Sequence, residues 1–196
     1  NLCIEGGMTA GDTVLIQAGA SGLGIAAIQL VKSLGGKVVT TVSTEQKAEF
    51  VRGLGADVVV NRTAEDLGAV MEENPVDIAL DCISGPELGK HLEKMARGGR
   101  WIVIATLGGP KTEIDMDLFF RRGLKLIGST LRSRPSEMKA RILSDLEKTL
   151  WPSFSSGETR PVIHKTLPID RAEEAHDILL RRENIGKVVL TVKEID

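Results

Sequence analysis

Six short apolar runs recur along the chain, and amphipathic stretches of about ten to fifteen residues separate them. Most of these runs are continuously apolar rather than alternating, as expected for strands of a parallel sheet that helices cover on both faces. The predicted strands span residues 13–18, 37–42, 58–61, 76–81, 100–105 and 125–128. The alternation predicts an α/β fold built on a doubly wound, parallel, six-stranded sheet.

Helices are predicted between the strands from apolar residues at helical spacing and from residues that favour helix ends. Three predicted helices span residues 22–34, 86–95 and 135–150. A further helix is predicted after Ser43, because Ser43 and Gln46 have the spacing of a capping box. Residues 153–157, which follow Trp151-Pro152, are expected to form a loop. A strand–helix–strand tail is predicted at residues 162–167, 170–181 and 187–192.

The composition excludes several classes of protein. The chain carries 25 basic and 27 acidic residues, a net charge of −2, and no basic stripe that would indicate a nucleic-acid partner. Pairs such as Arg181-Arg182 are interpreted as solvated helix ends. No apolar run approaches the roughly 20 residues of a membrane span, and no signal-peptide pattern opens the sequence, so we predict a cytoplasmic protein without a membrane partner.

Neither cysteines nor histidines suggest a metal site. Cys3 and Cys82 are too few and too far apart in the sequence for a disulfide framework or a zinc cluster. The three histidines, His91, His164 and His176, lack the spacing of ligands. We therefore predict that this stretch of chain binds no metal.

The first predicted strand runs directly into Gly19-Ala20-Ser21-Gly22-Leu23-Gly24 and then into a helix. A glycine-rich turn in this position binds the pyrophosphate of a dinucleotide, because the backbone approaches closely and free N–H groups at the helix start face the anion. Ser21 replaces the middle glycine of the G-x-G-x-x-G pattern, and the helix is expected to begin without a side-chain cap. The alternative is a plain tight turn in a fold that binds something else.

The end of the second strand indicates which dinucleotide is bound. An enzyme that uses NAD usually carries an acid there, which bonds the ribose 2′-hydroxyl. Here the chain has Ser43 instead, followed by Lys47 and Arg62, which would attract a 2′-phosphate. These residues favour NADP(H), although Lys47 could also be a solvated helix residue and Ser43 no more than an N-cap.

Seven stretches distributed over the chain match a known family. They span residues 10–16, 19–30, 54–57, 81–85, 98–100, 126–129 and 186–190. Through them the sequence resembles the medium-chain dehydrogenase/reductase superfamily, and within it the zinc-independent quinone oxidoreductase branch. The resemblance implies an NADP-binding Rossmann domain at residues 1–160. It also implies that residues 161–196 pack on an N-terminal GroES-like domain, and because the sequence opens with Asn1, we expect it to be part of a longer protein.

The resemblance also implies which residues bind the cofactor. They are Gly19, Ser21, Gly22, Leu23 and Gly24 at the pyrophosphate, Ser43, Lys47, Asn61 and Arg62 near the 2′-phosphate, and Thr106, Leu107, Gly108, Ser129 and Thr130 near the nicotinamide. Arg62 stands where many relatives have Tyr, which keeps the attraction for phosphate but loses a stacking surface. Lys187 could reach a cofactor phosphate or be a solvated lysine at a strand end, and Asp81 is interpreted as a structural rather than a catalytic acid.

The function that the resemblance implies is NADPH-dependent reduction of a quinone or an α,β-unsaturated carbonyl by hydride transfer. No residue of this stretch is nominated as a catalytic acid or base, so we expect the chain to bind NADPH but to turn over little substrate. The alternatives are an enoyl-thioester reductase, a non-catalytic NADPH-binding module and, least favoured by the balanced charge, a fold adapted to contact RNA.

A homodimer is predicted from the stretch between Thr112 and Asp117. Polar and apolar residues alternate there with period two, which is typical of a half-buried strand. In the family such a strand lies at the sheet edge and pairs with its symmetry mate, and an uncovered edge favours such pairing. The alternative is a solvated hairpin or loop over the sheet.

Overall fold

The computed structural model describes residues 1–192, and residues 193–196, the end of the predicted C-terminal segment, lie outside the described residues. The strands of the main sheet are β1 (Thr13–Ile16), β2 (Lys37–Val42), β3 (Val58–Asn61), β4 (Ile78–Asp81), β5 (Arg100–Val103) and β6 (Lys125–Gly128). They are all parallel, in the order β3-β2-β1-β4-β5-β6. This confirms the predicted doubly wound sheet and places its topological switch point between β1 and β4.

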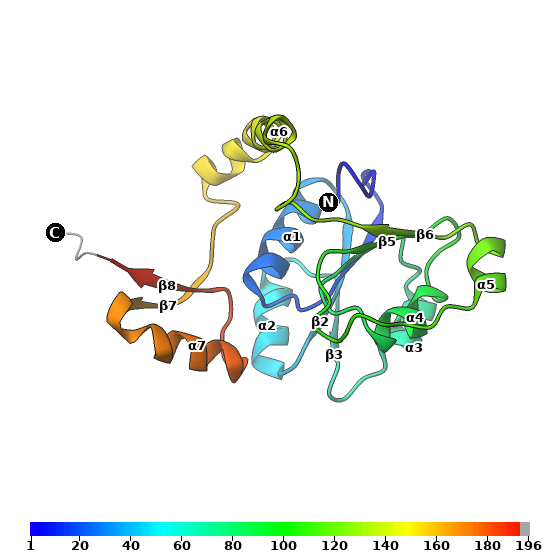
Figure 1. Ribbon diagram of the computed structural model, residues 1–196, viewed down its shortest axis with the longest axis horizontal. Helices are drawn as coiled ribbons and strands as arrows, with labels where there is room; N and C mark the ends of the chain where they lie inside the picture. The colour runs from blue at the N-terminus through cyan, green and yellow to red at the C-terminus, as the bar shows by residue number, and fades with distance from the viewer. Residues whose placement is uncertain (193–196) are drawn as a thin grey trace.

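Helices cover both faces of this sheet (Figure 1). The helices between its strands are α1 (Gly22–Ser33), α2 (Glu45–Gly53), α3 (Leu67–Glu73), α4 (Pro86–Leu92) and α5 (Met116–Arg121). The helix α6 (Ser136–Ser156), which leads to the tail, lies away from the sheet (Figure 1). Alternate strand residues pack in opposite directions: Val14 and Ile16 join the core beneath α1 and α2, whereas Leu15 joins the core beneath α3 and α4. Burial on both faces explains why the central strands β1, β2 and β4 read as continuous apolar runs.

The tail forms a separate unit. It consists of β7 (Ile163–Pro168), a short 3₁₀ helix (Ile169–Arg171), α7 (Ala172–Leu180) and β8 (Lys187–Thr191). The strands β7 and β8 pair in parallel, and Leu167, Ala175 and Ile178 form a small core between the helix and the two strands. In Figure 1 this unit lies beside α1 and α2, away from β6.

The prediction of a strand between Thr112 and Asp117 is wrong. Residues 111–115 have no regular secondary structure, and Asp115 caps α5 by accepting hydrogen bonds from the N–H groups of Asp117 and Leu118 at 2.9 and 3.0 Å. Thr112 is held against α4, where its hydroxyl accepts from the N–H of Gly89 at 2.9 Å. Capping and contact with α4 therefore override the period-two pattern.

Two other predictions about helix ends need correction. Residues 153–157 are not a loop, because α6 continues through Pro152 to Ser156 and ends at Gly157 in the left-handed conformation. The rings of Trp151 and Phe154 pack edge to face on this last part, with centroids 6.1 Å apart. The N-cap of α2 is Thr44 rather than Ser43, and its hydroxyl accepts from the N–H of Lys47.

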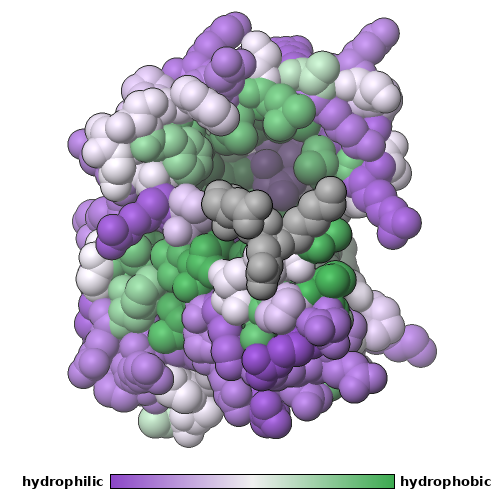
Figure 2. Space-filling view, turned by 90° about the vertical axis from the view of Figure 1, so that its left-hand side faces the viewer, coloured by the Kyte–Doolittle hydropathy of each residue, from purple (hydrophilic) through white to green (hydrophobic). Residues whose placement is uncertain are grey.

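The face of the molecule that carries the tail and α6 has apolar side chains around a hollow (Figure 2). The exposed apolar residues of these elements include Leu143, Leu146, Trp151, Phe154 and Ile163. Within residues 1–192 no helix combines the length and the apolar character needed to cross a bilayer.

Candidate functional site

The glycine-rich turn is fixed by close contact with β2. A Cβ on Gly19 would come within 2.1 Å of the Thr40 hydroxyl oxygen, and that hydroxyl donates to the carbonyl of Ile16 at 2.7 Å. The N–H of Gly19 donates to the carbonyl of Thr41 at 2.9 Å, and Ala18 adopts a φ of 57°. The turn is therefore tight in the way that an approach of backbone to phosphate requires.

The start of α1 differs in one respect from the prediction. Ser21 is its N-cap, and the Ser21 hydroxyl accepts a hydrogen bond from the N–H of Gly24 at 3.0 Å, so the expectation of an uncapped helix is wrong. The N–H groups of Gly22 and Leu23 have no acceptor within the helix, because they belong to its first turn. A Cβ on Gly24 would come within 2.4 Å of the Ala18 carbonyl, which explains the glycine there.

The tail crosses this turn. The N–H of Gly186 donates to the carbonyl of Ala20 at 2.8 Å, and Ser21 and Gly186 form an isolated parallel bridge. The side chain of Lys187 then lies over Gly22, where a Cβ would come within 2.3 Å of the lysine Cε. Lys187 is exposed, as expected for a solvated lysine, and its stem lies against Gly22, so its ammonium group is also near the mouth of the turn.

Near the end of β2, the charges of two basic residues, Arg62 and Arg182, act on a third, Lys47. Lys47 is only 9% exposed, and its ammonium donates to the main-chain carbonyl of Arg182 at 2.5 Å. Burial lowers the pKa of Lys47, and the charges of Arg62 and Arg182 lower it further. None of the three side chains forms a salt bridge with a carboxylate in the part of the chain that the structure describes. Lys47 is thus not the solvated helix residue of the alternative interpretation.

Asn61 organises the turn that carries Arg62. Its side-chain oxygen accepts from the hydroxyl of Thr63 at 2.7 Å, and its N–H donates to the carboxylate of Glu65 at 2.6 Å. Asn61 therefore shapes the end of β3, while Arg62 is exposed beside it. Ser43 is half-buried just after β2. Because Thr44 caps α2, the hydroxyl of Ser43 takes no part in the cap.

Asp81 is a structural acid, as predicted. Its carboxylate is fully buried and accepts three hydrogen bonds, from the N–H groups of Ile83 and Ser84 at 2.7 and 2.9 Å and from the indole of Trp101 at 2.8 Å. These bonds fix the loop after β4, including Ser84 with a φ of 58°. Beside it, burial raises the pKa of the Cys82 thiol, and the Asp81 charge raises it further.

The residues predicted near the nicotinamide lie on two more loops of the same edge. Leu107 and Gly108 donate their N–H groups to the carbonyls of Cys82 and Ile83 at 3.2 and 2.7 Å, so the loops after β4 and β5 pack together. The hydroxyl of Ser129, after β6, is bonded to Asn1 at 2.6 Å and to Arg134 at 3.0 Å. Thr106 and Thr130 are both exposed on these loops.

All fourteen predicted cofactor residues therefore lie at or after the carboxyl ends of strands, which in a parallel sheet lie on the same side. The glycine-rich turn and Lys47 are each hydrogen-bonded to the tail. Ser129 is instead hydrogen-bonded to Asn1 and Arg134. Sequence reasoning did not single out Arg182, which contacts Lys47 through its main-chain carbonyl, because Arg181-Arg182 was interpreted as a solvated helix end. Its only local signal is its position four residues before Gly186-Lys187.

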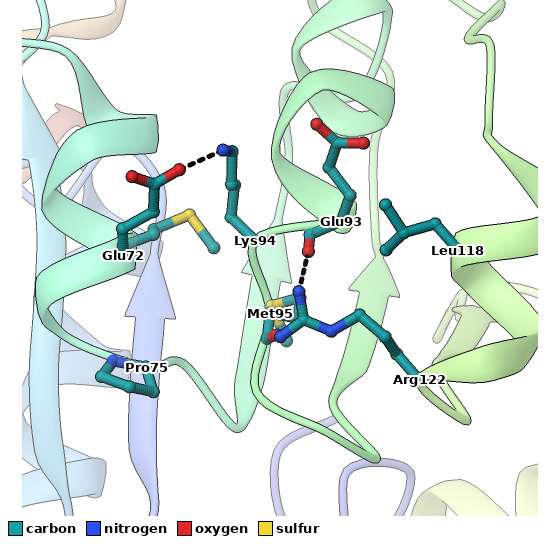
Figure 3. A pocket seen from close by; sticks show the side chains of 8 residues that line it. Glu72, Pro75, Glu93, Lys94, Met95, Leu118 and Arg122 are labelled. Atoms are coloured by element: carbon teal, nitrogen blue, oxygen red, sulfur yellow. Dashed lines mark hydrogen bonds and ion pairs between the residues drawn. The ribbon is translucent and has the colours of Figure 1, made fainter.

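The opposite edge of the sheet carries a pocket of about 320 Å³ (Figure 3). Lys94 pairs there with Glu72, and Arg122 donates to the carbonyls of Glu93 and Met95. The basic groups of this pocket are thus already paired within the protein, and none of the fourteen predicted cofactor residues lines it. Within residues 1–192 no group of three or more His, Cys, Asp or Glu side chains has the arrangement of a metal site.

Comparisons with known proteins show the family to which the chain is related. The family described as zinc-binding dehydrogenase matches residues 22–148. The chain is 30% identical to the quinone oxidoreductase of Sus scrofa and 31% identical to a 2-haloacrylate reductase of a Burkholderia species, in each case over 92% of this chain and 55% of the relative. The solved quinone oxidoreductase of Thermus thermophilus, which was also studied as an NADPH complex, superposes with a TM-score of 0.85 at 28% identity, covering 97% of this chain and 61% of that one. The chain thus spans about half the length of the curated relatives it matches.

Proposed function

Because the chain belongs to the zinc-binding dehydrogenase family of the medium-chain dehydrogenase/reductase superfamily, we propose that it is the NADP(H)-binding portion of an oxidoreductase that reduces quinones or α,β-unsaturated carbonyl compounds. The observation that carries this proposal is the glycine-rich turn at the switch point, with cations beside the next strand that form no salt bridge within residues 1–192. The relatives that act on quinones and on 2-haloacrylate support the substrate class. That the chemistry needs no zinc is part of the proposal and rests on the resemblance to the quinone oxidoreductase branch.

The residues present fit the cofactor. The N–H groups of Gly22 and Leu23 are available to a pyrophosphate. The side chain of Lys187 packs directly against Gly22, which a residue with a Cβ would not allow. Lys47 and Arg62 provide positive charge that no carboxylate of the described chain neutralises, which suits a 2′-phosphate. The nearby carboxylate of Glu65 is bonded to the N–H of Asn61, which fixes it within its own turn.

In this proposal the bound nicotinamide supplies the hydride, and the chain supplies position. The turn and α1 hold the pyrophosphate at the switch point, and Asp81 holds the loop against which residues 107 and 108 pack. The loops after β4, β5 and β6 then form one wall of a cleft that keeps water from the reacting carbon. No side chain of this wall is assigned as a proton donor.

The first test is calorimetric titration of this chain with NADPH and with NADH. We expect NADPH to bind at least about tenfold more tightly, because a charge-assisted bond to phosphate is worth about 1.5–3 kcal/mol. Equal affinity, or a preference for NADH, would contradict the proposed role of Lys47 and Arg62. Reduction assays of the full-length protein with a quinone and with a crotonyl thioester then separate the two substrate classes, and failure of both would favour a non-catalytic binding module.

The division of the chain into residues 1–160 and 161–196 stays a proposal. The separate two-stranded sheet of the tail and its small core support it. The exposed apolar side chains of α6 and β7, such as Trp151 and Ile163, support the expectation that this part of the molecule packs on a further domain.

A homodimer also stays a proposal, but on a different strand. The stretch from Thr112 to Asp117 forms no strand, whereas β6 ends the sheet and pairs only with β5 among the described residues. Most of β6 is exposed, including Leu126. We propose that this edge pairs with the β6 edge of a second copy, and a monomer in light scattering at high concentration would contradict it.

A further inference from the structure

We propose that Gln29, in α1, is a positioning residue of the cofactor site: its side-chain amide holds the main chain of Arg160 and so fixes where the tail crosses the glycine-rich turn. The inference rests on the proposed function, because its effect on the site is measured as affinity for the dinucleotide. It starts from a pair of hydrogen bonds between two residues that lie 131 positions apart in the chain.

The amide of Gln29 meets both main-chain groups of Arg160. Its oxygen accepts from the Arg160 N–H at 2.9 Å, and its nitrogen donates to the Arg160 carbonyl at 3.1 Å. The same nitrogen donates to the carbonyl of Ile25, one turn earlier in α1, at 3.2 Å. Gln29 is only 9% exposed, and burying an amide is unfavourable unless its polar atoms are hydrogen-bonded. The two bonds to Arg160 therefore fix both the position and the direction of the chain at that residue.

The chain reaches Arg160 directly after α6 ends. The N–H of Thr159 donates back to the Ser153 carbonyl at 3.0 Å, so the residue before Arg160 is held against the last part of α6. Pro161 follows Arg160, and its ring restricts the backbone just before β7 begins. The tail therefore starts at a point that Gln29 holds against α1.

Val162 carries this position onward to the glycine-rich turn. Its carbonyl accepts from the N–H of Lys187 at 2.9 Å, and a Cβ on Gly186 would come within 2.2 Å of the same carbonyl. The N–H of Gly186 in turn donates to the Ala20 carbonyl at 2.8 Å. A connected set of main-chain contacts therefore leads from Gln29 through the tail and back to the turn that precedes the same helix.

The packing of the tail does not fix this position by itself. Its buried core lies within the tail and consists, among the described residues, of Leu167, Ala175 and Ile178. Because few apolar contacts hold it, the tail can open locally when its hydrogen bonds to α1 are lost. The stem of Lys187 lies over Gly22 only while the tail is in place, so displacement of the tail would remove an ammonium group from the mouth of the turn.

The experiment compares Gln29→Met with the unmodified chain by hydrogen exchange and by calorimetry. Methionine has a similar length and suits a helix, but it forms neither bond to Arg160. We expect the amide hydrogens of β7 and β8 to exchange about tenfold faster, because two main-chain groups lose their partners. We expect the affinities for NADPH and NADH to fall together, by about fivefold, as the Lys187 ammonium leaves the turn.

Two further variants separate the clamp on Arg160 from other effects of the substitution. Gln46→Met is the matched control, since Gln46 is exposed on α2, and it should change neither the exchange of the tail nor the affinities. Gln29→Glu keeps the length and the acceptor for the Arg160 N–H, but its carboxylate cannot donate to the Arg160 carbonyl, so it should also speed the exchange of the tail. Circular dichroism checks that each variant is folded.

A double variant tests whether Gln29 acts through the tail. In the Lys187→Met background, Gln29→Met should lower the affinity for NADPH less than it does in the unmodified chain, because the ammonium group is already absent. Full additivity of the two losses would overturn the proposed path from Gln29 through the tail to the turn.

The failures are distinguishable. If the unmodified chain binds neither dinucleotide, the proposed function is wrong, and the role of Gln29 at the cofactor site falls with it. If the chain binds NADPH but Gln29→Met leaves the exchange of the tail or the affinity unchanged, the proposed function stands and the inference about Gln29 is overturned. A structural role confined to α1 would speed the exchange of β1 through global unfolding and leave the local opening of the tail as it was.

Discussion

Lys187 lies across Gly22, so closely that a Cβ on the glycine would come within 2.3 Å of the lysine Cε. The two residues are 165 positions apart in the printed sequence, on β8 and at the first position of α1. This contact places an ammonium group from the tail at the amino end of a helix, where the helix dipole favours an anion.

The first prediction concerns that ammonium group. Lys187→Met keeps the apolar stem over Gly22 but removes the charge, so we expect the affinities for NADPH and NADH to fall by the same factor, about fivefold for an exposed charge. Calorimetry measures both affinities. Lys37→Met, at the opposite edge of the sheet, is the control and should change neither. A loss confined to NADPH would place Lys187 at the 2′-phosphate instead.

The second prediction concerns the tight turn. Gly19→Ala should lower the free energy of unfolding by about 1–3 kcal/mol, because the added methyl group overlaps the Thr40 hydroxyl inside a closely packed contact. Gly53→Ala is the matched control: no atom lies within 4 Å of the added Cβ, and alanine in a helix should raise the same free energy by about 0.5–1 kcal/mol. Urea unfolding followed by circular dichroism measures both changes, and equal effects would refute the proposed overlap.

The third prediction concerns the buried acid. Asp81→Asn should lower the free energy of unfolding by about 2 kcal/mol or more. If the amide oxygen of the asparagine accepts from the loop N–H groups, its NH₂ group faces the indole N–H of Trp101, and two donors then meet without an acceptor. In the double variant with Trp101→Phe that donor is absent. Its loss should therefore be smaller than the sum of the two single losses, and strict additivity would speak against the direct bond.

The fourth prediction concerns pH. Burial is the main effect on the pKa of His91 and lowers it. Glu87 and Asp66 act in the opposite direction and raise this pKa, whereas the charge of Lys90 lowers it further. The Nδ1 of His91 donates to the Glu87 carbonyl at 2.8 Å, while its buried Nε2 has no hydrogen-bond partner among the described residues, so burial favours the neutral ring in the folded chain. The unfolded chain then binds the proton more tightly than the folded one. Stability is fully present above the ordinary pKa of 6.5 and declines as the pH falls below it.

Urea unfolding between about pH 5 and pH 7.5 tests this sign for the buried histidine. His91→Leu should flatten the decline at low pH, while His176→Gln, an exposed position on α7, should leave it in place. An unchanged slope in the His91 variant would assign the decline to other groups.

The sequence predicts the parts of this fold that depend on neighbouring residues. All six strands of the main sheet were predicted from continuous apolar runs, and the glycine-rich turn from its position between a strand and a helix. The predictions of secondary structure fail where a contact with a distant residue, or a local hydrogen bond, determines the conformation of the backbone. Asp115 caps a helix within a stretch that alternates like a strand, and α6 passes through Pro152, although proline in a helix interior costs about 3 kcal/mol.

The candidate site shows the same division. Gly19, Ser21 and Gly24 belong to a local motif, so sequence reasoning places them correctly on the turn. Arg182 is near Lys47 only because the chain returns from the tail, and no local pattern encodes that contact. The contact that buries the ammonium group of Lys47 was therefore not predicted.

The small core of the tail has a dynamic consequence. Only Leu167, Ala175 and Ile178 are fully buried in it among the described residues, so this unit gains little stability from its own packing and is expected to open locally at a free energy well below that of global unfolding. Amide hydrogens of β7 and β8 should then exchange faster than those of β1 and β4. A ligand that bridges the turn and Lys187 would slow this exchange, which makes the exchange rate of the tail a direct measure of site occupancy.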